Sequence, residues 1–68
     1  MAEVAEALIE LLVDEDLRLH AVGALGKLGA TASRSQVENL LRDERPAVRR
    51  AAATVLRKFD RLESDAAK

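Results

Sequence analysis

The stretches LRLHAVGALGKLG (residues 17–29) and VRRAAATVLRKFD (residues 48–60) share one spacing of small and apolar residues. In each, apolar side chains fall three and four positions apart, the spacing that lines one face of an α-helix. Written one above the other, the stretches align Leu17 with Val48, Ala21 with Ala52, Ala24 with Val55, Leu25 with Leu56 and Leu28 with Phe59. The chain therefore contains the same amphipathic helix twice.

A second helix precedes each of these stretches, and it also repeats, at a slightly smaller offset along the chain. The matched positions are Leu8 with Val37, Leu11 with Leu40, Leu12 with Leu41 and Asp14 with Asp43. The same smaller offset applied to the later helix would place Gly23 and Gly26 on apolar core positions, which glycine cannot fill. The two offsets differ because the turn of the first hairpin is shorter than that of the second.

These patterns predict an all-α chain of four helices, arranged as two antiparallel hairpins. Repeat one covers about residues 2–29 and repeat two about residues 33–62, within one domain of residues 1–62. Gly29 is expected to end the second helix, and Pro46 suits the first position of the fourth. Residues 63–68 are polar and small, so we expect a flexible tail there.

The composition is that of a small helical domain without covalent or metal cross-links. The chain has 68 residues, no Cys, one His and a single aromatic residue, Phe59. A core of this size supplies roughly 3–5 kcal/mol of net stability. The net charge of −1 indicates no global attraction to nucleic acid or membrane. The acidic N-terminus and the short uncharged runs favour a soluble, cytoplasmic protein.

The sequence resembles a known class of helical repeat. The segments VAEALIELLVD (residues 4–14) and ALGKLG (residues 24–29), together with LLRDE (residues 40–44) and VRRAAA (residues 48–53), resemble the HEAT-like repeat. The short type found in phycobilisome-lyase-like proteins is the most similar. The resemblance covers roughly residues 2–62. It implies an α-α superhelix, a right-handed solenoid in which the second helix of each repeat lines the concave side.

The same resemblance implies a ladder of ion pairs between repeats. Family members often share an Asp and an Arg six residues later, and Asp43 and Arg49 keep that spacing. In the first repeat Arg18 follows Asp14 by only four residues. The resemblance therefore predicts the ladder for the second repeat and leaves the first repeat open.

No residue pattern points to catalysis, a metal site or a cofactor. His20 could serve in acid–base chemistry, but no nucleophile or carboxylate stands at a cooperating position, so we interpret it as a surface residue. Glu3, Glu6 and Glu10 share the face turned away from the core, as solvated charges do. Gly23 lies inside a helix rather than in a phosphate loop, and we expect it to permit a close helix approach.

Several apolar residues of the first hairpin fall outside its core stripe. Leu19 and Val22 lie opposite Leu17 and Leu28, while Ile9 and Val13 stand where the second repeat has Glu38 and Arg42. Since terminal repeats of a solenoid need polar outer faces, the second hairpin is interpreted as a C-terminal cap. The first is interpreted as an internal repeat without its predecessor. The predicted apolar partner surface is Ile9, Val13, Leu19 and Val22.

The fourth helix carries a basic stripe of Arg50, Arg57 and Arg61 opposite its core residues. Residues 33–62 hold eight basic and four acidic side chains, whereas residues 1–16 hold six acidic and none basic. The stripe is either a solvated face or a binding site for an acidic partner. Nucleic acid is the weaker interpretation, because no aromatic residue stands among the arginines to stack on bases.

Together these features predict a protein–protein interaction or assembly module without catalytic activity. The partner would be a second copy, by dimerisation or by exchange of a hairpin through residues 29–33, or a larger protein. Alternatives are an accessory subunit of a chromophore or cofactor lyase, by family analogy only, a nucleic-acid-binding module, and a piece of a longer repeat protein. No cofactor, metal or membrane is expected.

Overall fold

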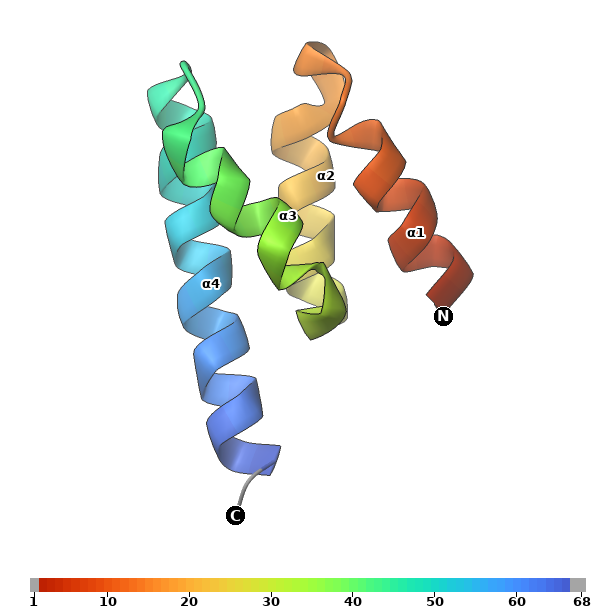
Figure 1. The fold of residues 1–68 in the computed structure, drawn as a ribbon, viewed down its shortest axis with the longest axis vertical. Helices are drawn as coiled ribbons and strands as arrows, with labels where there is room; N and C mark the ends of the chain where they lie inside the picture. The colour runs from red at the N-terminus through yellow and green to blue at the C-terminus, as the bar shows by residue number, and fades with distance from the viewer. Residues whose placement is uncertain (1, 67–68) are drawn as a thin grey trace.

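The computed structural model describes residues 2–66, and this range folds into helices and turns. The four helices are α1 (Ala2–Leu11), α2 (Glu15–Leu28), α3 (Arg34–Asn39) and α4 (Pro46–Ala66). Two short 3₁₀ helices, η1 (Thr31–Ser33) and η2 (Leu40–Arg42), flank α3 on either side (Figure 1). The predicted all-α fold of four helices is confirmed.

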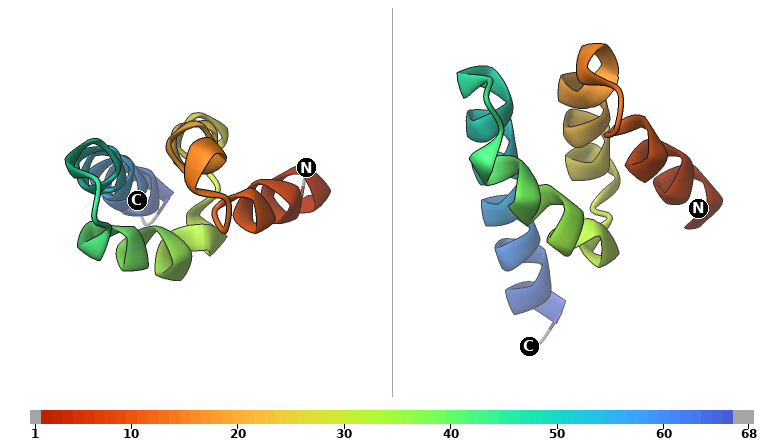
Figure 2. Two further views of the ribbon diagram at one scale, coloured as in Figure 1. Left: turned by 90° about the horizontal axis from the view of Figure 1, so that it is seen from above. Right: turned by 45° about the horizontal axis from the view of Figure 1, so that its top comes forward.

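The helices form two layers. Seen from above, α2 and α4 lie side by side in one layer, while α1 and α3 form the other (Figure 2). The most extensive helix contact joins α2 to α4, and α1 packs on α2 as α3 packs on α4. The chain is therefore two stacked helical hairpins, α1–α2 and α3–α4, as the HEAT-like repeat pattern predicts.

The core lies between the two layers and draws on three of the helices and on the turn after α1. Leu25 of α2 and Phe59 of α4 are its largest fully buried side chains. The other buried apolar residues are Leu12, Ala21, Val22, Val37, Val48, Ala52 and Val55. Phe59 is the only aromatic residue of the chain, so its burial places the one large ring at the centre of the packing.

The helix ends follow the capping residues in the sequence. Asp14 precedes α2, and its Oδ1 accepts the backbone N–H of Asp16 at 2.8 Å. Asp43 makes the same contact with the N–H of Arg45 at 2.9 Å, so the two aspartates have the same role in their turns. Gly29 ends α2 with a φ of 65°, a left-handed conformation that glycine adopts without the clash of a Cβ atom.

The fourth helix is longer than predicted. It continues past Leu62 to Ala66, and Arg34 of α3 pairs with Asp60 at 2.9 Å and with Glu63 at 2.8 Å along this part of the helix. These carboxylates lie about one turn apart on α4, so one guanidinium can bind both. The predicted tail is thus helical over residues 63–66, and residues 67–68 lie outside the described range.

A glycine other than the one predicted allows α2 and α4 to approach closely. A Cβ atom added to Gly26 would lie 2.8 Å from Cγ2 of Val55 on α4. A Cβ atom added to Gly23 would meet nothing within 4 Å among the described residues. The close approach therefore depends on Gly26, and the expectation for Gly23 is wrong.

None of the described helices combines the length and the apolar character that crossing a membrane requires. Localisation to the cytoplasm stays a prediction.

Candidate protein-interaction surface

Matched positions of the two hairpins differ sharply in their exposure. Val48 and Phe59 of α4 are 0% exposed, whereas their counterparts Leu17 and Leu28 in α2 are each 41% exposed. Successive residues of an α-helix are rotated by about 100°, so Leu17 lies on the opposite side of α2 from Gly26, the residue that contacts α4. Leu17 and Leu28 face away from the second hairpin. The described elements leave them exposed there, whereas Val48 and Phe59 are fully covered.

The helix α1 adds further apolar surface to the same hairpin. Val4 and Leu11 are exposed, and their spacing of seven residues puts them on one side of α1. Their counterparts in the second repeat, Ser33 and Leu40, are buried and half-buried. We call Val4, Leu11, Leu17 and Leu28 the N-terminal face. It consists of exposed positions whose counterparts in the second hairpin are buried or half-buried.

The apolar surface predicted from the sequence is only partly exposed. Val22 is 0% exposed and belongs to the core, so its prediction as a surface residue is wrong. Ile9 is half-buried and packs against the core cluster. Val13 and Leu19 are exposed. Leu19 lies seven positions before Gly26, hence on the α4 side of α2, and the four residues do not form one surface.

The structure thus adds Leu17 and Leu28 to the exposed apolar surface, although the helix pattern predicts them in the core. The signal that could have found them was the alignment of the second helix with the fourth. It pairs them with Val48 and Phe59, which are buried, and Phe59 packs in one cluster with Ala21, Val22 and Leu25 of the first hairpin. The first hairpin has no described neighbour on its other side, so its own copies of these positions are open.

The basic stripe of Arg50, Arg57 and Arg61 is exposed along α4. Arg57 and Arg61 line a hollow with Thr54, Lys58 and Leu62. In the alignment of α2 with α4, the three arginines correspond to Leu19, Gly26 and Ala30, on the side of α2 turned to α4. They therefore occupy the face where a third hairpin would stack, which we call the C-terminal face. The arginines make this face polar.

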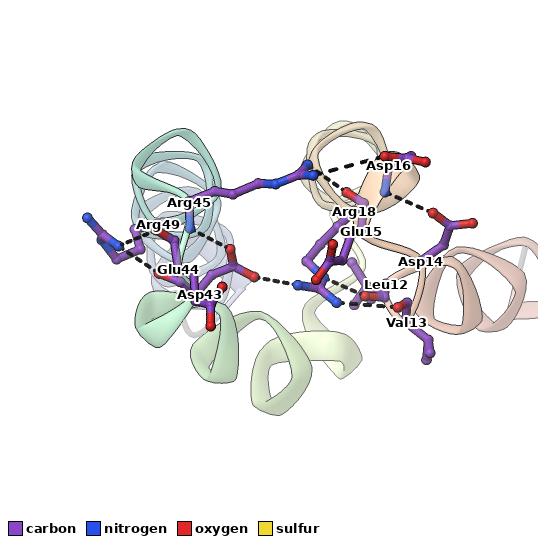
Figure 3. A network of polar contacts seen from close by, with 10 residues as sticks. All are labelled: Leu12, Val13, Asp14, Glu15, Asp16, Arg18, Asp43, Glu44, Arg45 and Arg49. Atoms are coloured by element: carbon purple, nitrogen blue, oxygen red, sulfur yellow. Dashed lines mark hydrogen bonds and ion pairs between the residues drawn. The ribbon is translucent and has the colours of Figure 1, made fainter.

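An ion pair joins the turns of the two hairpins (Figure 3). Nη1 of Arg18 donates to Oδ2 of Asp43 at 2.7 Å, and Nε of Arg18 donates to the carbonyl of Leu12 at 2.7 Å. The N–H of Arg45 and the guanidinium of Arg18 hold the pKa of Asp43 below its ordinary value. Arg18 thus closes its own turn and binds the next hairpin at the same time.

The matching arginine of the second hairpin makes the backbone contacts without the ion pair to another hairpin. Arg49 donates to the carbonyls of Asp43 and Glu44 at 2.7 and 3.2 Å. Arg18 binds the carbonyls of Leu12 and Val13 in the same way, so the two arginines are equivalent (Figure 3). The ladder between repeats that the resemblance implies is formed by Asp43 of the second repeat and Arg18 of the first, the repeat whose part was left open.

A second contact between the turns comes from Arg45. Its Nη1 donates to the carbonyl of Glu15 at 2.8 Å, and its Nη2 lies 4.0 Å from a carboxylate oxygen of Asp16. The C=O of Glu15 belongs to the first turn of α2, so this bond ties the start of α4 to the start of α2. Both bridges fix the relative position of the hairpins at one end of the stack.

The described residues offer no arrangement for metal binding. No group of three or more His, Asp or Glu side chains converges within the part of the chain that the structure describes. His20 is exposed, as are Glu6 and Glu10. Phe59 is buried, so the basic stripe lies beside no ring on which a base could stack. The notable surfaces are the apolar N-terminal face and the basic C-terminal face.

Two stacked antiparallel hairpins with equivalent turns define a helical-repeat protein. A family model for HEAT repeats matches residues 5–68, and the chain belongs to the HEAT repeat family. This match is to HEAT repeats in general, so the phycobilisome-lyase-like type stays a prediction. Searches of curated proteins and of solved structures gave no match.

Proposed function

We propose that this chain is a protein-interaction module that binds its partner through the N-terminal face and performs no chemistry itself. HEAT repeats commonly mediate protein–protein interaction. One observation supports the assignment of the face. Positions that are fully buried in the second hairpin, Val48 and Phe59, are occupied in the first by half-exposed Leu17 and Leu28. Large apolar side chains kept at uncovered positions favour association.

The size of the face suits a partner of modest dimensions. Burying an apolar side chain from water contributes about 1.5–3 kcal/mol when the burial is complete, and less for residues already half covered. Four such residues support an affinity in the range of a transient complex, since association also costs translational and rotational freedom.

A comparison of three immobilised proteins tests this proposal. They are the wild type, the variant Leu17→Glu/Leu28→Glu, and a control, Leu41→Glu/Leu62→Glu. The control replaces two leucines of the second hairpin that are 42% and 38% exposed, so the added charge and the original exposure are matched. Circular dichroism first establishes that all three are equally helical.

When a protein mixture is passed over the three, the proposal predicts that a partner protein is retained by the wild type and by the control. The same partner should not be retained by Leu17→Glu/Leu28→Glu. The same set of retained proteins on all three would contradict it. Equal loss on the control and on Leu17→Glu/Leu28→Glu would also contradict it, because the effect would then follow charge and not the N-terminal face.

A further inference from the structure

The contacts at the turns show what kind of partner the N-terminal face can take. Asp43 uses one carboxylate oxygen for the N–H of Arg45 and the other for Arg18 of the preceding hairpin. Asp14 holds the equivalent position in the first hairpin. Within residues 2–66, its side chain accepts one hydrogen bond, from the N–H of Asp16. A hairpin stacked on the N-terminal face in the same geometry would therefore bring an arginine to Asp14, as the first hairpin brings Arg18 to Asp43.

The second hairpin of another copy does not fit this place, although its Arg49 could reach an Asp. Stacking in the same geometry would press Arg50, Arg57 and Arg61 against Leu17, Ala24 and Leu28. Burying guanidinium groups against leucines without carboxylates removes their hydration and is unfavourable. The arginines of the C-terminal face therefore prevent wild-type copies from stacking head to tail.

A hairpin with small residues at those positions meets no such obstacle. In the observed stack, Gly26 faces Val55, and a Cβ atom there would clash. The counterpart of Val55 on the N-terminal side of α2 is Ala24, which has no Cγ2 methyl group, the atom of Val55 that such a Cβ would meet at 2.8 Å. A partner helix can therefore carry alanine at the point of closest approach.

Resting on the function proposed above, we infer that the N-terminal face binds one HEAT-type hairpin other than this chain's own second hairpin. The partner hairpin presents an arginine to Asp14, and it places small or apolar residues over Leu17, Ala24 and Leu28. The arginine supplies register and the apolar contact supplies most of the affinity, since an exposed ion pair contributes little on its own.

A variant of this chain provides the probe. The probe carries the substitutions Arg50→Leu, Arg57→Ala and Arg61→Ala. They make its C-terminal face similar to that of the first hairpin, which has Leu19, Gly26 and Ala30. All three replacements are favourable in a helix. Leu17→Glu in the same molecule disables its own N-terminal face, so the probe cannot polymerise. Circular dichroism establishes that the probe is folded. It is then titrated into fluorescently labelled receptors, and complex formation is followed by sedimentation velocity.

Four receptors are compared: the wild type, Asp14→Asn, Leu17→Glu and the control Asp65→Asn. We expect a one-to-one complex with the wild type and the control, and none with Leu17→Glu. Asn keeps the capping oxygen of Asp14 and loses its charge, so Asp14→Asn should weaken binding by about two- to fivefold. The wild type without probe should remain a monomer across the concentration range.

Three results would overturn the inference: no complex between the folded probe and the wild type, equal affinity of the wild type and Asp14→Asn, or oligomers of the wild type alone that Leu17→Glu abolishes. The last result would replace the partner hairpin with a second copy of this chain. Each leaves the comparison of Leu17→Glu/Leu28→Glu with its control standing. Failure of that comparison would instead remove the N-terminal face as a binding surface.

Discussion

The two hairpins have the same plan, and they differ at the faces that each turns away from the other. The second hairpin has its inner positions filled by Val48 and Phe59 and its outer face covered by arginines. The first has apolar or small residues on both sides, with Gly26 packed on Val55 and Leu17 and Leu28 half-exposed. The difference shows that the same repeat can end a stack or continue it, according to the residues on its outer face.

The largest expected effect contrasts the matched pair Phe59 and Leu28. Phe59→Ala removes a fully buried ring, and such changes cost about 3–5 kcal/mol, as much as a core of this size supplies. We expect this variant to be largely unfolded at room temperature. Leu28→Ala should cost only about 1 kcal/mol, because part of that side chain is already in water. Urea titrations followed by circular dichroism measure both, and equal losses would contradict the assigned exposures.

Two glycine substitutions with smaller and opposite effects on stability test the contact between α2 and α4. Gly23→Ala should stabilise the protein by about 0.5–1 kcal/mol, because alanine is the better helix former and the site is open. Gly26→Ala should destabilise it by about 1–2 kcal/mol, since overpacking against Val55 outweighs the gain in helix propensity. Thermal melts distinguish the two signs. Combining Gly26→Ala with Val55→Ala should recover part of the loss, and no recovery would argue against this contact.

The smallest effect concerns the paired aspartates of the turns. Asp43→Asn should lower the melting temperature at pH 7 more than Asp14→Asn does, because only Asp43 binds an arginine of the other hairpin. The pKa of Asp43 is lowered in the fold, so its contribution is present above the unfolded value of about 3.9. It is lost as the pH falls through the lower folded value.

Melting temperatures between pH 7 and pH 2 measure this linkage. Asp43→Asn should show a shallower loss at acid pH than the wild type, and the two should converge at the lowest pH. A constant difference between the wild type and Asp43→Asn over the whole range would show that the charge of Asp43 plays no part.

The fold could be predicted from the sequence because each helix has a clear apolar period and each turn has a marked capping residue. Asp14, Gly29 and Asp43 identify the turns without any tertiary information. The prediction failed where exposure depends on neighbours. The helix pattern predicts Val22 at the surface because it lies off the stripe of Leu17 and Leu28. Instead α1 and α4 pack on α2 and bury the side that carries Val22 and Leu25, and the stripe stays half-exposed.

The candidate surface was harder to predict than the fold, for the same physical reason. A helix period shows which residues share a side, but not which side a neighbouring hairpin covers. Leu17 and Leu28 therefore looked like core residues, although they are the open half of a stacking face. The three arginines of the basic stripe are exposed, since a row of arginines on one helix face remains exposed in almost any packing, and their role in binding stays a prediction.

The absence of cysteine permits one direct test of the central claim, that the stacking positions buried in the second hairpin are open in the first. The single variants Leu17→Cys and Val48→Cys place a thiol at matched positions, and their reaction rates with a disulfide reagent are compared under native conditions. The account predicts that Cys at position 17 reacts at nearly the rate of a free thiol. Cys at position 48 should react at least about tenfold more slowly, since it reacts only when the fold opens. Equal rates at the two positions, in variants that are both folded, would contradict the account.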